Sequence, residues 1–129
     1  MSERAFPVIY AQDVERTSSF YERLGFHEHY RLPPEGPSGY VGLSRGTAEL
    51  AVVTIDSPRE LIGVDIGDRP RFEMFIYVDA VDRVIEELET AGATVLQPPR
   101  DMPWGERVGY VTDPDGNPVA LATVTAPAP

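Results

Sequence analysis

The sequence predicts an α+β fold built from two similar modules in tandem. The chain matches itself at an offset of 67 residues, which superposes Ile9 and Tyr10 on Ile76 and Tyr77. Each copy opens with a short run of β-favouring residues, continues into an amphipathic helical pattern and returns through further β-like runs. Helices that bury one stripe against strands in this order are typical of the α+β class.

The chain of 129 residues has the length of one ordinary domain. We expect module one over residues 5–56, a connector over 57–71 and module two over 72–125. The connector retains aliphatic side chains, Leu61 and Ile62 among them. We therefore expect it to pack against the domain rather than to be disordered.

Both predicted helices have recognisable ends. Asp13 is a suitable N-cap for the first helix, and Asp79 precedes the second. Gly25 and Gly92 are placed to end them. Their buried stripes are Val14, Ser18, Tyr21 and Leu24 in the first helix, and Val81, Val84, Ile85, Leu88 and Ala91 in the second.

The β-like runs amount to roughly four strands per module. They cover residues 6–11, 26–32, 39–45 and 48–55 in module one, and 72–78, 93–99, 107–112 and 118–124 in module two. The sequence DPDG at 113–116 predicts a hairpin turn, because Pro presets one dihedral and Gly accepts a positive φ. It lacks the downstream Glu of a calcium-binding loop.

Composition limits the compartment and the partners. The formal charge is −10, from 21 acidic residues against 11 arginines, and there is no cysteine. Such a charge disfavours nucleic acid and anionic membranes as partners. It favours a cationic or neutral small molecule, or it serves only solubility, and both interpretations stay open. Without cysteine, a long apolar run or a signal-like N-terminus, we expect a cytoplasmic protein.

Side chains alternate along a strand, so each opening strand presents two different faces. One face is aliphatic and suits packing under the helices. The other face carries Phe6, Val8 and Tyr10 in module one, and Glu73, Phe75 and Tyr77 in module two. An aromatic face of this kind is costly to expose, so we expect a ligand cleft or a second subunit to cover it.

Two stretches resemble the vicinal oxygen chelate superfamily, which includes glyoxalase I, extradiol dioxygenases, fosfomycin-modifying enzymes and bleomycin-resistance proteins. QDVERTSSFYERLGF at 12–26 resembles the first helix of that family, and WGERVGYVTDPDGNP at 104–118 resembles its last hairpin. The resemblance implies two tandem βαβββ modules that form a concave mixed sheet, with helices on the outer face, in a homodimer.

In the enzymes of that superfamily, four side chains on the concave face hold a divalent metal. Carried over one at a time, with Gly46 matched to Gly116, those positions fall on Phe6, Leu50, Glu73 and Ala120. Only Glu73 could ligate, and such metals need about three protein donors. We therefore expect no metal and no other cofactor.

Four residues are the remaining candidates for ligands, and they form three cases. The side chain of Glu49 is expected on the face opposite to that of Leu50. His27 and His29 form a pair at i, i+2 that is more typical of a solvated strand edge than of a metal site. Glu73 is either a polar residue at the sheet border, or a counter-charge for a cation or an acceptor for a hydroxyl, and both interpretations stay open.

Without the metal ligands, the chain resembles the bleomycin-resistance proteins, which work by binding. PWGER at 103–107 resembles their segment whose tryptophan lines the drug groove, and Tyr30 and Tyr40 fall near two positions that stack on the drug. Aromatic rings provide a rigid contact area for a planar ligand. The predicted ligand-binding residues are Trp104, Tyr40, Tyr30, Tyr10, Glu73, Phe75, Tyr77 and Phe6.

We therefore predict a cytoplasmic homodimer without catalytic residues that sequesters a bulky natural-product antibiotic and leaves it unmodified. A bleomycin-type glycopeptide or an enediyne with a planar aromatic portion would suit such a site. The acidic charge favours a cationic drug and the tyrosine-rich face favours a planar neutral one. Alternatives are a metal-dependent enzyme of the same fold, a metal-free enzyme that uses Glu73 as acid or base, and a partner-binding module without a small ligand.

Overall fold

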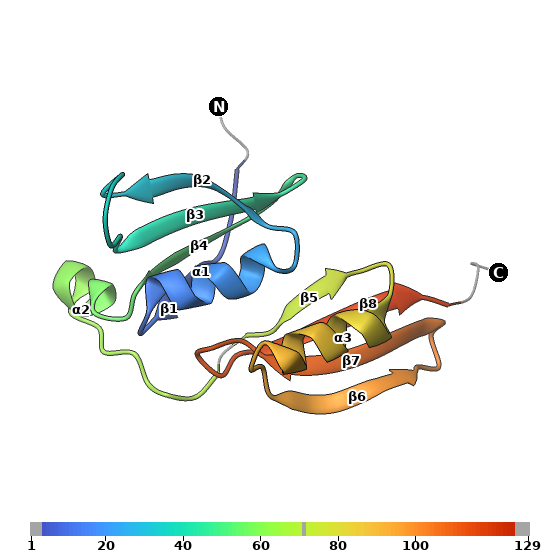
Figure 1. Cartoon of the computed structure of the whole chain (residues 1–129). Coiled ribbons are helices and arrows are strands. Elements are labelled where there is room, and N and C mark those ends of the chain that lie inside the picture. Colours follow the sequence, from blue (N-terminus) through green and yellow to red (C-terminus); the bar gives the residue numbers. More distant parts are fainter. Residues whose placement is uncertain (1–3, 71, 126–129) are drawn as a thin grey trace. The chain divides into compact units, whose positions relative to one another are not determined.

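A computed structural model of the chain describes residues 4–70 and 72–125 (Figure 1). The chain divides into two compact units, unit one (Met1–Asp68) and unit two (Arg69–Pro129). Each unit contains a strand, a helix and three further strands in chain order. This order confirms the predicted α+β class and the tandem βαβββ modules.

The strands and helices follow the predicted runs closely. Unit one contains β1 (Val8–Ala11), α1 (Val14–Glu22), β2 (His27–Leu32), β3 (Tyr40–Arg45), β4 (Ala48–Thr54) and α2 (Ser57–Ile62). Unit two contains β5 (Met74–Tyr77), α3 (Val81–Thr90), β6 (Val95–Asp101), β7 (Glu106–Thr112) and β8 (Pro118–Val124).

Each unit builds its own four-stranded mixed sheet. The strand orders are β1-β4-β3-β2 and β5-β8-β7-β6. In each sheet the opening strand runs parallel to its neighbour, and the other pairs are antiparallel. The strand β6 carries Pro98 and Pro99 and lies at a sheet edge, where a missing N–H donor is tolerated.

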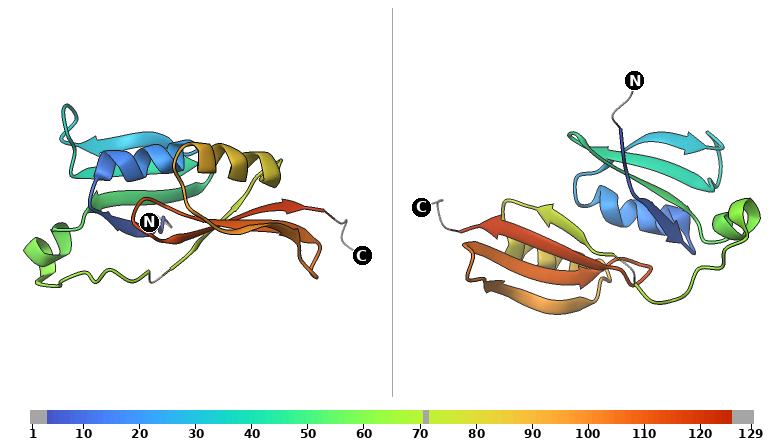
Figure 2. Two further views of the ribbon diagram at one scale, coloured as in Figure 1. Left: turned by 60° about the horizontal axis from the view of Figure 1, so that its bottom comes forward. Right: turned by 180° about the vertical axis from the view of Figure 1, so that it is seen from behind.

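One helix packs on one face of each sheet. The helix α1 contacts β3 and β4, and α3 contacts β6, β7 and β8. When the chain is viewed from behind, the strands of unit two lie in front of α3 (Figure 2). On the opposite face of each sheet, the described residues place no helix of the same unit, and we call it the open face.

Local chemistry explains where the helices begin and end. The side chain of Asp13 accepts a hydrogen bond from the backbone N–H of Arg16 at 3.1 Å, as expected for an N-cap. The N-cap of α3 is Ala80 rather than Asp79, and it offers no side-chain hydrogen bond. Gly25 follows α1 with a φ of 91°, a left-handed conformation that glycine adopts without strain.

The predicted helix stripes are buried in α1 and only partly buried in α3. All four residues of the first stripe are buried, whereas Val84 is half-buried and Ala91 exposed in the second. The largest fully buried side chains are Tyr21, Ile9, Leu43, Leu50, Val41 and Val52 in unit one, and Leu121, Val108, Val111 and Val119 in unit two.

The DPDG sequence forms the predicted turn between β7 and β8. Asp113 is buried, and its Oδ1 accepts hydrogen bonds from the backbone N–H groups of Asp115 and Asn117, both at 2.9 Å. Its Oδ2 accepts a hydrogen bond from the side-chain amide of Asn117 at 2.9 Å. The carboxylate therefore holds the loop closed, which supports the turn interpretation.

The connector differs from its prediction. Residue 71 lies outside the described part of the chain, and residues 57–62 form α2. Leu61 and Ile62 are 79% and 68% exposed. The expectation that their aliphatic side chains pack is therefore wrong, because α2 buries only Pro58. Among the described residues, no helix is long and apolar enough to cross a membrane.

Both opening strands are shorter than predicted. The strand β1 begins at Val8 and β5 begins at Met74, so Phe6 and Glu73 lie just before them. The predicted alternation holds within the strands, because Ile9 and Ile76 are buried while Val8, Phe75 and Tyr77 are exposed. The aromatic side chains therefore lie on the open faces.

Candidate functional site

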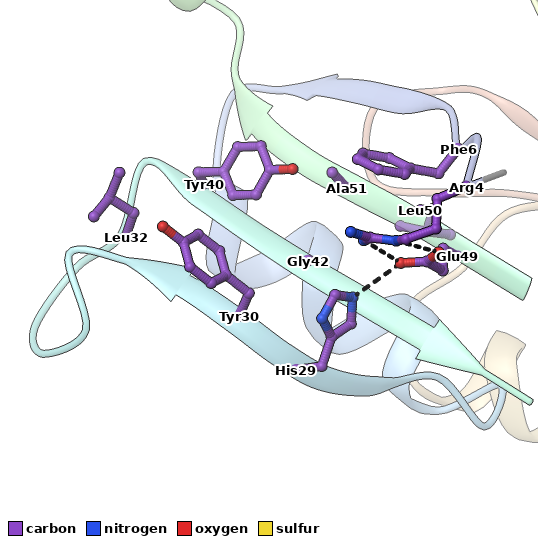
Figure 3. A pocket seen from close by; sticks show the side chains of 10 residues that line it. All are labelled: Arg4, Phe6, His29, Tyr30, Leu32, Tyr40, Gly42, Glu49, Leu50 and Ala51. Atoms are coloured by element: carbon purple, nitrogen blue, oxygen red, sulfur yellow. Dashed lines mark hydrogen bonds and ion pairs between the residues drawn. The ribbon is translucent and has the colours of Figure 1, made fainter. Parts of the chain in front are cut away.

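The open face of unit one contains a cavity of about 510 Å³ (Figure 3). Three strands and the segment before β1 supply its walls. The lining residues are Arg4, Phe6, His29, Tyr30, Leu32, Tyr40, Gly42, Glu49, Leu50 and Ala51. The volume lies in the range of small-molecule sites, and the lining is apolar with a few polar groups, as such sites require.

A β-bulge turns His29 toward the cavity. The register between β2 and β3 shifts between Glu28 and Tyr30, so His29 is an additional residue without a partner in the ladder. Consecutive side chains normally point to opposite faces, but here both His29 and Tyr30 line the cavity. Gly42 lies beneath the His29 ring and leaves room for it.

Two tyrosines form the aromatic wall of the cavity. The ring centroids of Tyr30 and Tyr40 are 5.9 Å apart, and the rings meet edge to face at 79°. Tyr30 is exposed and Tyr40 is half-buried. A planar ligand could contact both rings without a large rearrangement, because the edge-to-face contact already restricts them.

The acidic group of the cavity is paired with arginine. Arg4 donates two hydrogen bonds to the Glu49 carboxylate, at 2.6 Å to Oε1 and 3.0 Å to Oε2. These hydrogen bonds hold the pKa of the Glu49 carboxyl below its usual range. The Arg4 guanidinium also lies over the ring of Phe6, 5.5 Å from its centroid. The two formal charges at this end of the cavity therefore cancel.

The predicted register of β4 is wrong by one residue. Gly42 pairs with Ala51, and Glu49 and Ala51 share the open face, whereas Leu50 is 1% exposed. Leu50 was carried over as a metal-ligand position, and Glu49 was expected on the opposite face. In the structure, Glu49 points into the cavity, with Oε1 3.6 Å from His29 Nε2.

A second aromatic and acidic cluster lies on unit two. The hydroxyl of Tyr77 donates a hydrogen bond to Glu106 Oε2 at 2.6 Å, and the indole N–H of Trp104 donates to Oε1 at 2.8 Å. The rings of Phe75 and Tyr77 are 5.5 Å apart between centroids. We call Phe75, Tyr77, Trp104 and Glu106 the Glu106 cluster.

The structure groups most of the predicted ligand-binding residues. Phe6, Tyr30 and Tyr40 line the unit-one cavity, and Phe75, Tyr77 and Trp104 belong to the Glu106 cluster. Tyr10 is half-buried on β1 and is not a lining residue of the cavity. Glu73 is exposed and precedes β5.

Sequence reasoning did not select Arg4, His29, Glu49 or Glu106 as site residues. The signal for Glu106 was present, since strand alternation places Glu106, Val108 and Tyr110 on one face. Arg4 gave no such signal, because it precedes β1 and meets Glu49 across 45 residues of sequence.

The residues present do not fit the divalent-metal site of the superfamily's enzymes. The side chains of Phe6, Leu50 and Ala120 carry no donor atoms. The Glu49 carboxylate is already bound by Arg4 through both oxygens. Within residues 4–70 and 72–125, no group of three or more His, Asp or Glu side chains could hold a metal ion.

Comparison with known proteins assigns the chain to one superfamily. Residues 5–121 match the Glyoxalase/Bleomycin resistance protein/Dioxygenase superfamily. Two mycobacterial sequences, from Mycobacterium bovis and Mycobacterium tuberculosis and provisionally named glyoxylase CFP32, are 27% identical over 109 residues. The match covers 84% of this chain and 41% of each relative, so the chain spans about two fifths of their length.

Several solved structures are similar over almost the whole chain. A glyoxalase-related enzyme from Fulvimarina pelagi has a TM-score of 0.78 at 26% identity, covering 95% of this chain and 88% of its own. TioX from Micromonospora sp. ML1 has a TM-score of 0.77 at 23% identity, covering 95% of this chain and 99% of its own. A bleomycin resistance determinant encoded on transposon Tn5 has a TM-score of 0.66 at 21% identity, covering 97% of this chain and all of its own.

Proposed function

The chain belongs to the glyoxalase/bleomycin resistance protein/dioxygenase superfamily, and from that premise we propose that it is a cytoplasmic binding protein. Its ligand is a bulky natural-product antibiotic with a planar aromatic portion, held in the unit-one cavity and released chemically unchanged. The superfamily includes enzymes as well as resistance proteins, so the proposal depends on the chemistry of the cavity.

The tyrosine-walled cavity carries the proposal. It is large enough for a polycyclic aromatic group, and its rings are positioned by an edge-to-face contact at 5.9 Å. Its carboxylate is bound by Arg4 through both oxygens. Such a carboxylate is a weak candidate for proton transfer or metal binding, whereas the rings are well suited to stacking.

Charge within the cavity favours a neutral planar group over a cationic one. Arg4 and Glu49 cancel each other, and their bidentate pair would have to break before Glu49 could bind a ligand cation. The sequence left open whether the ligand is cationic or neutral. For this cavity we propose the neutral planar portion.

A ligand screen tests the proposal. We expect a bleomycin-type glycopeptide or an enediyne chromophore to raise the melting temperature of the protein, because a ligand that binds only the folded state stabilises it. Mass spectrometry of the recovered compound should show no modification. Turnover of the compound to a product would overturn the proposal in favour of an enzyme.

Variants of the aromatic wall localise the binding. Tyr40→Ala should weaken binding about tenfold, since it removes a stacking ring and its contact area. Tyr40→Phe keeps the ring and should retain most of the affinity. Leu61→Ala removes an exposed apolar side chain outside the cavity and is the matched control. Equal affinities of Tyr40→Ala and the control would place the ligand elsewhere.

The proposed assembly is a homodimer. Val8 on β1 and Phe75 on β5 are both exposed on open faces, and a second copy of the chain would remove such apolar area from water. Sedimentation equilibrium should give twice the mass of the chain. A single-chain mass at high micromolar concentration would contradict this assembly.

A further inference from the structure

We propose that the Glu106 cluster is a binding site for an organic cation, an ammonium or guanidinium group carried by a small molecule. The inference rests on the proposed function only in treating the open faces as ligand surfaces. It adds a second site, in unit two, whose chemistry differs from that of the unit-one cavity.

The Glu106 carboxylate organises two aromatic rings. Trp104 donates to one of its oxygens at 2.8 Å and Tyr77 donates to the other at 2.6 Å. Trp104 lies in the turn before β7, and Tyr77 ends β5. One carboxylate therefore holds together rings from two segments that are 27 residues apart in sequence.

The rings keep exposed surface while the hydrogen bonds hold them. Phe75, Tyr77 and Trp104 are 43%, 51% and 60% exposed. Ring faces carry negative potential, so a cation is attracted to them, most strongly to tryptophan. Beneath this face, Val108, Ala120 and Ala122 form a buried floor of short side chains.

The charge of Glu106 is not cancelled as that of Glu49 is. Among the described residues, the side-chain partners of Glu106 are a phenol and an indole, which are both neutral. A carboxylate has about four acceptor positions, so two hydrogen bonds leave room for a charged donor. Negative charge among aromatic rings is the arrangement that recognises an organic cation.

The neighbouring arginine does not supply the missing cation. Arg107 follows Glu106 on β7 and points to the opposite face of the sheet. There it donates to both carboxylate oxygens of Asp82 on α3, at 2.7 and 3.0 Å, and to Asp101 at 3.3 Å. The formal charge of −10 on the whole chain also favours the approach of a cation.

The single tryptophan reports directly on this site. Choline is the probe, and dimethylbutanol, in which a tert-butyl group replaces the trimethylammonium group, is its neutral isostere. At constant ionic strength we expect choline to change Trp104 fluorescence saturably and dimethylbutanol to change it at least about fivefold more weakly, the scale of a single exposed charge interaction. Equal responses to the two probes would overturn the proposal.

Three variants test which carboxylate binds the cation. Glu106→Gln should lower the affinity for choline about fivefold, because it removes the charge and keeps the shape of the side chain. Glu86→Gln, an exposed position on α3, controls for net charge. Glu73→Gln tests the carboxylate for which the sequence analysis left a counter-charge role open, and an effect there rather than at Glu106 would overturn the proposal.

A folding defect must be separated from a binding defect. Tyr77→Phe keeps its ring and the Glu106 charge while removing one hydrogen bond, so it should lose less affinity for choline than Glu106→Gln does. If Glu106→Gln loses more affinity than Tyr77→Phe, the charge is responsible. If both lose binding equally, the carboxylate acts only by positioning the rings, and the cation site is refuted.

The two proposals fail independently. The cation site fails if choline and dimethylbutanol behave alike, even when planar antibiotics still raise the melting temperature. The antibiotic proposal fails if no planar compound stabilises the protein, even when choline still changes Trp104 fluorescence.

Discussion

The imidazole of His29 lies directly against Gly42, because a Cβ built on Gly42 would be 3.3 Å from both Cε1 and Nε2 of that ring. The glycine is therefore part of the floor of the unit-one cavity. Any side chain at this position must displace the ring or occupy the cavity. This relationship links the bulge in β2 to the shape of the proposed binding site.

Gly42→Val should abolish binding of planar ligands at the cavity while the protein still folds. The branched side chain would fill the cavity floor, and His29 could move because it lies at a partly exposed position. Binding by thermal shift and folding by circular dichroism give the comparison. Gly39→Ala is the control, since its added Cβ would meet Thr54 Cγ2 at an ordinary contact distance of 3.7 Å. Unchanged affinity in Gly42→Val would show that the ligand avoids this floor.

Ser18→Ala should stabilise the protein. Within residues 4–70 and 72–125, the Oγ of Ser18 is a buried oxygen without a hydrogen-bond partner, and the residue is 1% exposed. An unsatisfied buried hydroxyl costs about 1–3 kcal/mol, and alanine also has the higher helix propensity. We expect the free energy of unfolding in urea to rise by about 1 kcal/mol.

The neighbouring Ser19 provides the control for that measurement. It is exposed on the same helix, so Ser19→Ala changes helix propensity without removing a buried hydroxyl. The gain in Ser18→Ala should exceed the gain in Ser19→Ala. Equal gains would mean that the buried hydroxyl carries no penalty.

The fold followed from the sequence because helix and strand periods are local signals. The alternation in β1 and β5 and the cap at Asp13 depend on residues a few positions apart. The register of β4 could not be predicted from such local signals. Gly46 was matched to Gly116, but the strand ladders pair Val8 with Ala51 and Phe75 with Ala120.

The wrong register of β4 comes from the different lengths of two turns, not from the strands themselves. A short turn joins β3 to β4, whereas the longer loop closed by Asp113 joins β7 to β8. Aligning the glycines therefore shifted one copy by a residue, and a shift of one residue exchanges the two faces of a strand. The pair of Arg4 and Glu49 could not be predicted from the sequence either, because these residues meet only in the folded chain.

The titration of Tyr77 should depend on Glu106. The hydrogen bond to Glu106 raises the pKa of the Tyr77 hydroxyl above its ordinary value, since the carboxylate favours the protonated phenol. A pKa raised in the folded state contributes stability at pH values below the unfolded pKa of about 10. That contribution is lost as the pH rises through the folded pKa.

Glu106→Gln should therefore shift one tyrosine to ionise at lower pH. Phenolate absorbance measured during a pH titration gives the comparison. In a Tyr77→Phe background the same Glu106→Gln change should leave the titration curve unaltered. A shift that persists in that background would assign the effect to another tyrosine.

Gly109→Ala should destabilise the protein, because the strand β7 and the helix α3 approach too closely for a side chain at this position. A Cβ on Gly109 would lie 3.1 Å from Ile85 Cδ1 and 3.2 Å from Pro99 Cγ. Ile85 is buried and Pro99 is a rigid ring, so neither can give way easily. Overpacking of this kind costs about 1–3 kcal/mol. Gly42→Ala adds the same methyl group against the partly exposed His29, so urea unfolding should show a smaller loss there, and equal losses would mean that unit two relaxes around the new side chain.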